Sequence, residues 1–269
     1  MTPMEVCLYL GVRNTFMVPV GINVNHRQYN KSFKTLRQVG WDCFEATESP
    51  EKLDELIGDA AEFPNIGCVV FDDFCRIDTD NVMKYKKIPI YTFKALQYKV
   101  HNNGVRRLNS WMVLYTYEFG LNTEDDTSFQ PFVDMFDGII MWTWEEKDVP
   151  LIPEKFEIFR KMTQNNRRMF GCYLYNFGEN KKATGDAVKW QLDWYREKFS
   201  QARPRVLCST PIQWPTLTTR PMMWPVAGWR STVTRKCRIF HFKSKDTYMD
   251  NHHASHTVDK GAVKKVQTA

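Results

Sequence analysis

The 269-residue chain carries 37 Lys and Arg against 31 Asp and Glu, a formal charge of +6, and is 43% hydrophobic and 14% aromatic. This composition supports a large core and excludes a mostly disordered chain. No run of 18 apolar residues is present, and Met1–Val20 lacks the basic start and apolar core of a signal peptide. Seven scattered cysteines without a CxxC pair indicate buried thiols in a reducing compartment. We therefore expect a cytoplasmic protein with no membrane partner.

The charge divides the chain after Arg203. Residues 204–269 hold 11 basic and three acidic residues, a net +8, so the remaining 26 basic and 28 acidic residues give residues 1–203 a net −2. Closely spaced prolines in the 204–269 segment disfavour both helix and central strand. We predict a globular domain over residues 1–203 and an irregular basic tail over residues 204–269. Because the basic excess belongs to that tail, a nucleic-acid partner is not favoured.

Strands and helices alternate along the first domain. Short β-branched or aromatic segments predict six strands, at residues 15–20, 40–45, 66–72, 110–115, 138–142 and 169–175. Amphipathic stretches predict helices at residues 30–38, 50–63, 90–101, 128–135, 153–165 and 184–199. This alternation predicts an α/β fold with a parallel sheet covered on both faces. No glycine-rich phosphate loop follows a strand, so the pattern favours a (β/α)8 TIM-barrel-like fold over an open nucleotide-binding sheet.

The barrel is predicted to be incomplete, with its first and last βα units missing or disrupted. Met4–Gly11 indicates a helix ahead of the first strand, and Arg205–Lys236 shows neither the strand nor the helix expected there. Read one base out of register, Met222–Pro225 must encode Asp-Val-Ala, and permissible codons turn its surroundings into an apolar strand and an amphipathic helix. We hypothesise that a frameshift near Arg203 has produced a non-native, disordered tail; an intact reading frame in the gene would contradict this. The alternative is a genuine basic extension that binds an anionic partner, with tryptophans stacked on bases.

Acidic and aromatic side chains follow the predicted strands, where barrel active sites are built. The candidate catalytic groups are Asp72, Asp73, Glu118 and Glu145. The candidate substrate-binding residues are Glu45, Arg76, Tyr115, Tyr117, Trp142, Trp144, Tyr175 and Asn176. Two carboxyl groups can act as acid and as base or nucleophile in glycoside hydrolysis, and aromatic faces stack on sugar rings. The structural alternatives are that Asp72 caps a turn, that Asp73 pairs with Arg76, that the glutamates are solvated, and that Trp142 packs in the core.

About half of the chain, residues 63–199, resembles a group of bacterial proteins with glycoside-hydrolase-like TIM barrels. The resemblance is carried by FPN at 63–65, VVFDDF at 69–74, WMVLY at 111–115, WTW at 142–144 and GCYLYNFG at 171–178. It implies a barrel with a carbohydrate site centred on Asp72 and Asp73, and it names no reaction. Thr116 and Tyr117 stand where the group has an aspartate–histidine pair, which weakens a role for that loop.

These patterns predict a glycoside-hydrolase-like protein that acts on or binds a carbohydrate, without a cofactor or a metal. The alternative enzyme is a metal-dependent sugar isomerase or aldolase-type barrel, with Asp72, Asp73 and Glu145 as oxygen ligands. A third interpretation is a non-catalytic sugar-binding barrel, or a remnant inactivated by its missing unit.

Overall fold

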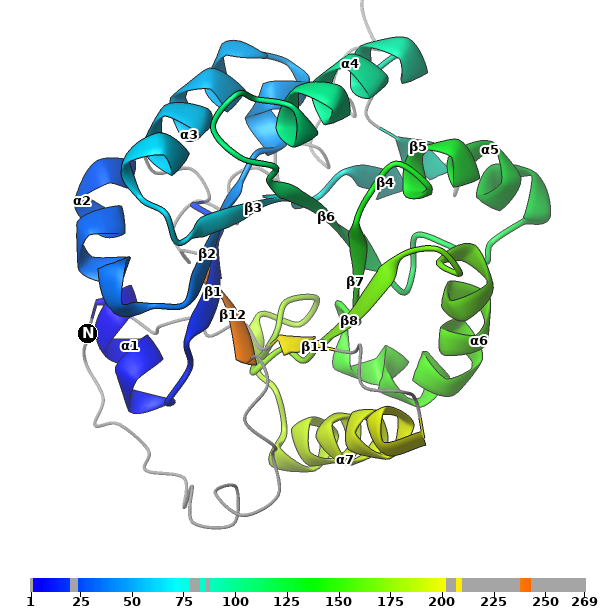
Figure 1. The fold of residues 1–269 in the computed structure, drawn as a ribbon. Coiled ribbons are helices and arrows are strands. Elements are labelled where there is room, and N and C mark those ends of the chain that lie inside the picture. The colour runs from blue at the N-terminus through cyan, green and yellow to red at the C-terminus, as the bar shows by residue number, and fades with distance from the viewer. Residues whose placement is uncertain are drawn as a thin grey trace, which may run out of the picture.

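The structure, a computed structural model, describes residues 2–19, 24–77, 83–85, 88–201, 207–209 and 238–242. Eight parallel strands form a closed barrel in the order β1-β12-β11-β8-β7-β6-β3-β2, with helices around it (Figure 1). Six of these strands match the six predicted ones: β1 (Asn14–Met17), β2 (Gln38–Asp42), β3 (Ile66–Phe71), β6 (Asn109–Tyr115), β7 (Gly138–Trp142) and β8 (Arg167–Gly171). The fold is α/β and TIM-barrel-like, as predicted.

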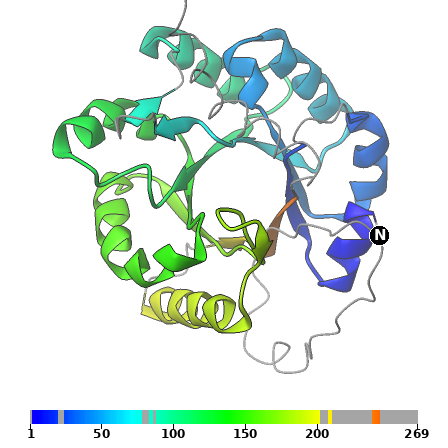
Figure 2. The ribbon, with the colours of Figure 1, turned by 180° about the vertical axis from the view of Figure 1, so that it is seen from behind.

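The covering helices correspond to the six predicted ones. They are α2 (His26–Ser32), α3 (Glu51–Glu62), α4 (Ile90–His101), α5 (Thr123–Val133), α6 (Ile152–Met162) and α7 (Gly185–Gln201), and α1 (Pro3–Tyr9) precedes β1. Of these, α2 and α5 begin four and five residues earlier than predicted. Short 3-10 turns add η1 (Phe33–Thr35), η2 (Phe44–Thr47) and η3 (Glu146–Leu151). The view from behind shows the same ring of helices around the strands (Figure 2). Within the described ranges, no helix has the length and apolar character needed to cross a membrane.

Two short strands from the segment expected to be irregular complete the barrel. β11 (Leu207–Ser209) pairs with β8, β12 (Arg238–Phe242) pairs with β1, and β11 and β12 pair with each other. The prediction that Arg205–Lys236 contains no strand was therefore wrong at β11, where a short apolar run satisfies backbone groups at the edge of β8. Because β12 closes onto β1, the last two units are represented among the described residues by their strands. The frameshift hypothesis concerns residues that otherwise lie outside the described ones.

The barrel interior has an apolar middle layer. Because side chains alternate along a strand, residues of one parity point inward; the inward apolar cluster contains Phe16, Cys68, Val70, Trp111, Val113, Ile140 and Met169. Two glycines make room for large rings, since a Cβ at Gly138 would lie 2.3 Å from Trp111 and one at Gly171 would lie 1.9 Å from Trp142. This layer separates the two polar ends of the barrel.

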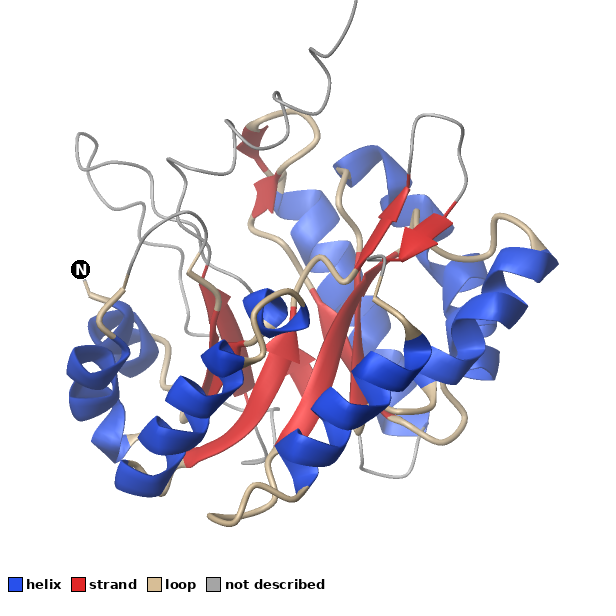
Figure 3. Ribbon diagram, turned by 90° about the horizontal axis from the view of Figure 1, so that it is seen from above, coloured by secondary structure: helices blue, strands red, loops and turns tan. Residues whose placement is uncertain are grey.

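Two hairpins follow strands at the carboxyl end of the barrel (Figure 3). The hairpin of β4 (Cys75–Ile77) and β5 (Met83–Tyr85) follows β3, and that of β9 (Tyr175–Asn176) and β10 (Lys181–Lys182) follows β8. The outer faces of the strands pack against the helices in a second core, in which four cysteines take part as buried free thiols: Cys7, Cys43, Cys75 and Cys172. Burial of these thiols agrees with the sequence prediction.

Candidate functional site

Four polar side chains meet at the carboxyl ends of neighbouring strands. Asp42 is the last residue of β2, Asp72 directly follows β3, and Tyr115 is the last residue of β6. Tyr173 lies two residues beyond β8. Each keeps the inward parity of its strand, so the alternation that builds the apolar layer also gathers these groups above it.

Hydrogen bonds link the group into one chain. The Tyr173 hydroxyl donates to the Tyr115 hydroxyl at 3.3 Å, and the Tyr115 hydroxyl donates to Asp72 Oδ1 at 3.2 Å. Asp42 Oδ1 accepts from the backbone N–H groups of Asp72 at 3.3 Å and Phe44 at 3.2 Å. Asp72, Tyr115 and Tyr173 are all at most 5% exposed. The two aspartates are therefore held in fixed positions, one above the turn after β2 and the other against a tyrosine pair.

The environment of Asp42 favours its protonated form. Burial, together with the nearby Asp72 and Asp73, raises the pKa of Asp42 to about 8, although the two backbone N–H donors oppose the shift. At neutral pH, Asp42 therefore holds a proton, and its Oδ1 lies 3.3 Å from the backbone nitrogen of Asp72. A neutral carboxylic acid beside a carboxylate is an arrangement suited to general acid–base chemistry.

Aromatic rings border the carboxyl pair. Tyr117 stacks on Tyr115 with ring centroids 5.4 Å apart and planes 4° apart. Trp144 meets Tyr115 edge-on at 5.4 Å and stacks on Phe177 at 4.7 Å. Tyr117, Trp144 and Phe177 are only partly buried. We refer to these three residues as the aromatic rim, because they present ring surface next to Asp72 and its tyrosine partner.

Three predicted site residues have structural contacts elsewhere at this end. Glu118 is 1% exposed, and its Oε2 accepts from the backbone N–H of Tyr115 at 2.7 Å, which stabilises the turn after β6. Glu145 forms an ion pair with Lys147 and packs closely against Gly178. Trp142 is fully buried and stacks on Tyr173 at 4.4 Å, as its core-packing alternative requires.

The remaining predicted residues lie around the group. Asp73 adopts a positive φ of 51°, which an aspartate tolerates in a turn, and its charge acts on Asp42. Glu45 is exposed on η2, and the backbone of Arg76 lies in β4 opposite Lys84. The side chain of Arg76 lies outside the described residues.

The β9–β10 hairpin carries the last two predicted substrate-binding residues. The Tyr175 hydroxyl donates to Asn180 within the hairpin. Asn176 is 2% exposed and accepts from the backbone N–H of Glu179 at 3.4 Å, while its amide nitrogen has no hydrogen-bond partner in the described part of the chain. The hairpin also contributes Phe177 to the aromatic rim, so it belongs to the border of the site.

Asp42 is the residue that the sequence interpretation missed. The signal was present, because Gly40 and Asp42 share one parity on the strand predicted at residues 40–45, and Gly40 is too small to fill an outer core. The strand had been placed at residues 40–45, so Glu45 was taken as its last acid; β2 ends three residues earlier.

The described part of the chain shows no arrangement of side chains typical of a metal site. In the described ranges, no three His, Cys, Asp or Glu side chains converge in a metal-binding arrangement. Asp72, Asp73 and Glu145 thus do not come together as the oxygen ligands that the metal-dependent alternative requires.

Comparisons with known proteins give few matches. No protein-family model and no curated protein match the chain. Among solved structures, the chain is similar to an HpcH/HpaI aldolase from Desulfitobacterium hafniense DCB-2, with a TM-score of 0.40 and 10% sequence identity over 94% of each chain. The resemblance to glycoside-hydrolase-like bacterial proteins stays a prediction.

Proposed function

We propose that the protein binds a carbohydrate at the carboxyl end of its barrel and acts on it by the acid–base chemistry of a glycoside hydrolase. The observation that carries the proposal is the Asp42–Asp72 pair, in which a half-buried acid with a raised pKa is bonded to the backbone of a second, buried aspartate. In glycoside hydrolysis, Asp42 donates its proton to the glycosidic oxygen as the bond to the sugar breaks. Asp72 acts as the base for the attacking water or as the nucleophile.

The surroundings of the pair support a sugar as the ligand. The aromatic rim offers ring faces to the apolar faces of a pyranose, and the carboxyl groups accept hydrogen bonds from its hydroxyls. Tyr115 fixes Asp72 Oδ1 at 3.2 Å, so the carboxylate is oriented before a ligand arrives. The predicted roles of Asp72 and Trp144 stay in the proposal, with Asp42 replacing Glu118 and Glu145 as the partner acid.

The test is a panel of aryl glycosides and oligosaccharides assayed with the full chain and two variants. Asp72→Asn and Asp42→Asn are each expected to lower kcat by about 10²–10⁴-fold, because each removes one proton-transfer group. Asp134→Asn is the matched control, since Asp134 is exposed on the outside of the barrel. Circular dichroism checks that all three variants fold.

The outcomes separate the three interpretations. Hydrolysis that resists a chelator and is lost in both site variants supports the proposal. Activity that disappears with a chelator would instead support the metal-dependent isomerase or aldolase-type alternative. Sugar binding without turnover, lost on Trp144→Ala, would support a non-catalytic sugar-binding barrel.

A further inference from the structure

We propose a second binding site, for a small phosphate-type anion, at the amino end of the barrel. This end lies across the apolar layer from the carboxyl pair, and the proposal is independent of any action on a carbohydrate. It rests on a cavity, and on a buried acceptor and three arginines that have no hydrogen-bond partner and no acidic partner, respectively, among the described residues.

The first observation is a small cavity inside the amino end of the strands. Its lining includes the first residues of three strands, Asn14 of β1, Gln38 of β2 and Arg167 of β8, together with Cys68 and Trp111 deeper in the barrel. It has room for roughly two water molecules. One or two oxygens of a small anion can enter a space of that size, whereas a nucleotide or a sugar cannot.

The second observation is an unsatisfied acceptor in the cavity wall. Asn14 is 3% exposed, and its Oδ1 has no hydrogen-bond partner in the described part of the chain. A buried polar atom without a partner costs free energy, so such atoms mark places where a bound group completes the hydrogen bonds. Because an amide oxygen only accepts, the missing group must supply a donor such as a hydroxyl.

The third observation is positive charge without matching acids. The guanidinium of Arg167 lies over the Trp111 ring, 4.8 Å from its centroid, and its Nε donates to the backbone oxygen of Asp137 at 3.4 Å. Arg13 and Arg37 precede β1 and β2, are exposed, and lie side by side through a backbone bond of 2.7 Å. None of these three arginines forms an ion pair with a described acid.

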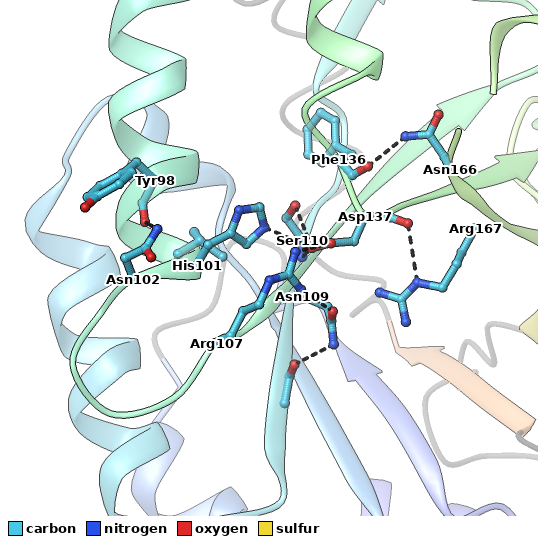
Figure 4. A network of polar contacts seen from close by, with 12 residues as sticks. Tyr98, His101, Asn102, Arg107, Asn109, Ser110, Phe136, Asp137, Asn166 and Arg167 are labelled. Carbon is cyan, nitrogen blue, oxygen red and sulfur yellow. Dashed lines mark hydrogen bonds and ion pairs between the residues drawn. The ribbon is translucent and has the colours of Figure 1, made fainter. Parts of the chain in front are cut away.

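The nearby acid at this end is already engaged. The Asp137 carboxylate accepts from His101 at 3.0 Å and from the backbone N–H of Ser110 at 2.8 Å, and it is ion-paired with Arg107. Figure 4 shows this network beside Arg167. The charge of Arg167 is thus left for a ligand, and the field of Arg13 and Arg37 favours an anion.

These features together select the chemical class of the ligand. The planar guanidinium group of an arginine donates two parallel hydrogen bonds to the oxygens of a phosphate-type anion. Asn14 Oδ1 requires that the same anion also carry a hydroxyl. Hydrogen phosphate meets both conditions near neutral pH, because it retains one hydroxyl. Sulfate has a similar size and charge but no hydroxyl at that pH, so it tests the role of Asn14.

The experiment measures binding of inorganic phosphate and of sulfate to the full chain by calorimetry and by thermal shift at matched ionic strength. We expect phosphate to bind several-fold more tightly than sulfate. Arg167→Gln is expected to weaken phosphate binding by about tenfold or more, and Arg167→Lys by less, because lysine keeps the charge without the fork. Asn14→Leu should remove the preference for phosphate over sulfate.

Arg196→Gln is the matched control, since Arg196 is exposed on α7. Equal binding of phosphate and sulfate by the unchanged protein would overturn the role of Asn14. Phosphate binding that is unchanged in Arg167→Gln, or that does not exceed the effect of chloride at the same ionic strength, would overturn the site.

Discussion

The two ends of the barrel shift aspartate pKa values in opposite directions. At the carboxyl end, burial and two neighbouring aspartates raise the pKa of Asp42. At the amino end, Asp137 is also largely buried, but bonds from Arg107, Ser110 and His101 outweigh burial and lower its pKa. The position of an aspartate along the barrel therefore decides the direction of its pKa shift, because other acids lie near it at the carboxyl end and basic groups lie near it at the amino end.

The apolar layer between the ends gives the largest expected effect. Gly171→Ala places a Cβ 1.9 Å from the fully buried Trp142 ring, which cannot move without disturbing Tyr173 and the carboxyl end. We expect a loss of about 3 kcal/mol or more in the free energy of unfolding, because overpacking a filled core forces strain. Urea denaturation measures the loss.

The control is Gly58→Ala in α3, where a Cβ would meet no atom within 4 Å. There the change should stabilise the protein by about 0.5–1 kcal/mol, because alanine favours helix. If both glycine variants lose the same stability, the two ends are not separated by a tightly packed layer.

Asp42→Asn tests the raised pKa at the carboxyl end. The folded protein keeps the Asp42 proton up to a pKa of about 8, whereas an unfolded aspartate releases it near about pH 4. The folded state therefore binds the extra proton in this window, and stability falls as the pH rises through it. Asparagine resembles the protonated acid, so the variant should gain roughly 2–3 kcal/mol over the parent at pH above about 8 and little near about pH 4. Denaturation curves across this range with Asp134→Asn as control measure it, and a gain independent of pH would contradict the shift.

Asp137→Asn should show the opposite pH dependence at the amino end. Because the pKa of Asp137 is lowered in the folded state, its stabilising contribution is complete above the unfolded pKa and is lost as the pH falls through the folded value. Removing the charge from bonds to Arg107 and His101 should cost about 2 kcal/mol at neutral pH. The same denaturation series should show this cost shrinking in acid. A constant cost would mean that the carboxylate charge contributes nothing.

The sequence predicted the barrel better than the site. Strand and helix positions follow from apolar periodicity, so β7 and α4 were placed with their observed bounds. The site depends on which end of each strand a residue occupies. Because the predicted end of β2 was three residues too late, Glu45 was chosen as the strand-end acid in place of Asp42. Glu118 was assigned a catalytic role that the structure does not support, because its carboxylate accepts a hydrogen bond from the Tyr115 backbone within a turn. Hydrophobic periodicity does not reveal such a turn. β11 was missed because three residues in a proline-rich segment carry too weak a pattern.

The smallest expected effect concerns the tyrosine pair that orients Asp72. Tyr115→Phe removes the hydroxyl that donates to Asp72 Oδ1 and that accepts from Tyr173, while the ring can still stack on Tyr117. We expect a stability loss of about 1 kcal/mol. The pKa of Asp42 should also rise, because Asp72, whose charge raises that pKa, loses a hydroxyl donor. Carboxyl-labelled aspartate followed by NMR titration measures this without any substrate. Tyr98→Phe, on the exposed face of α4, is the matched control; an unchanged titration in Tyr115→Phe would show that the tyrosine packs beside the acids without orienting them.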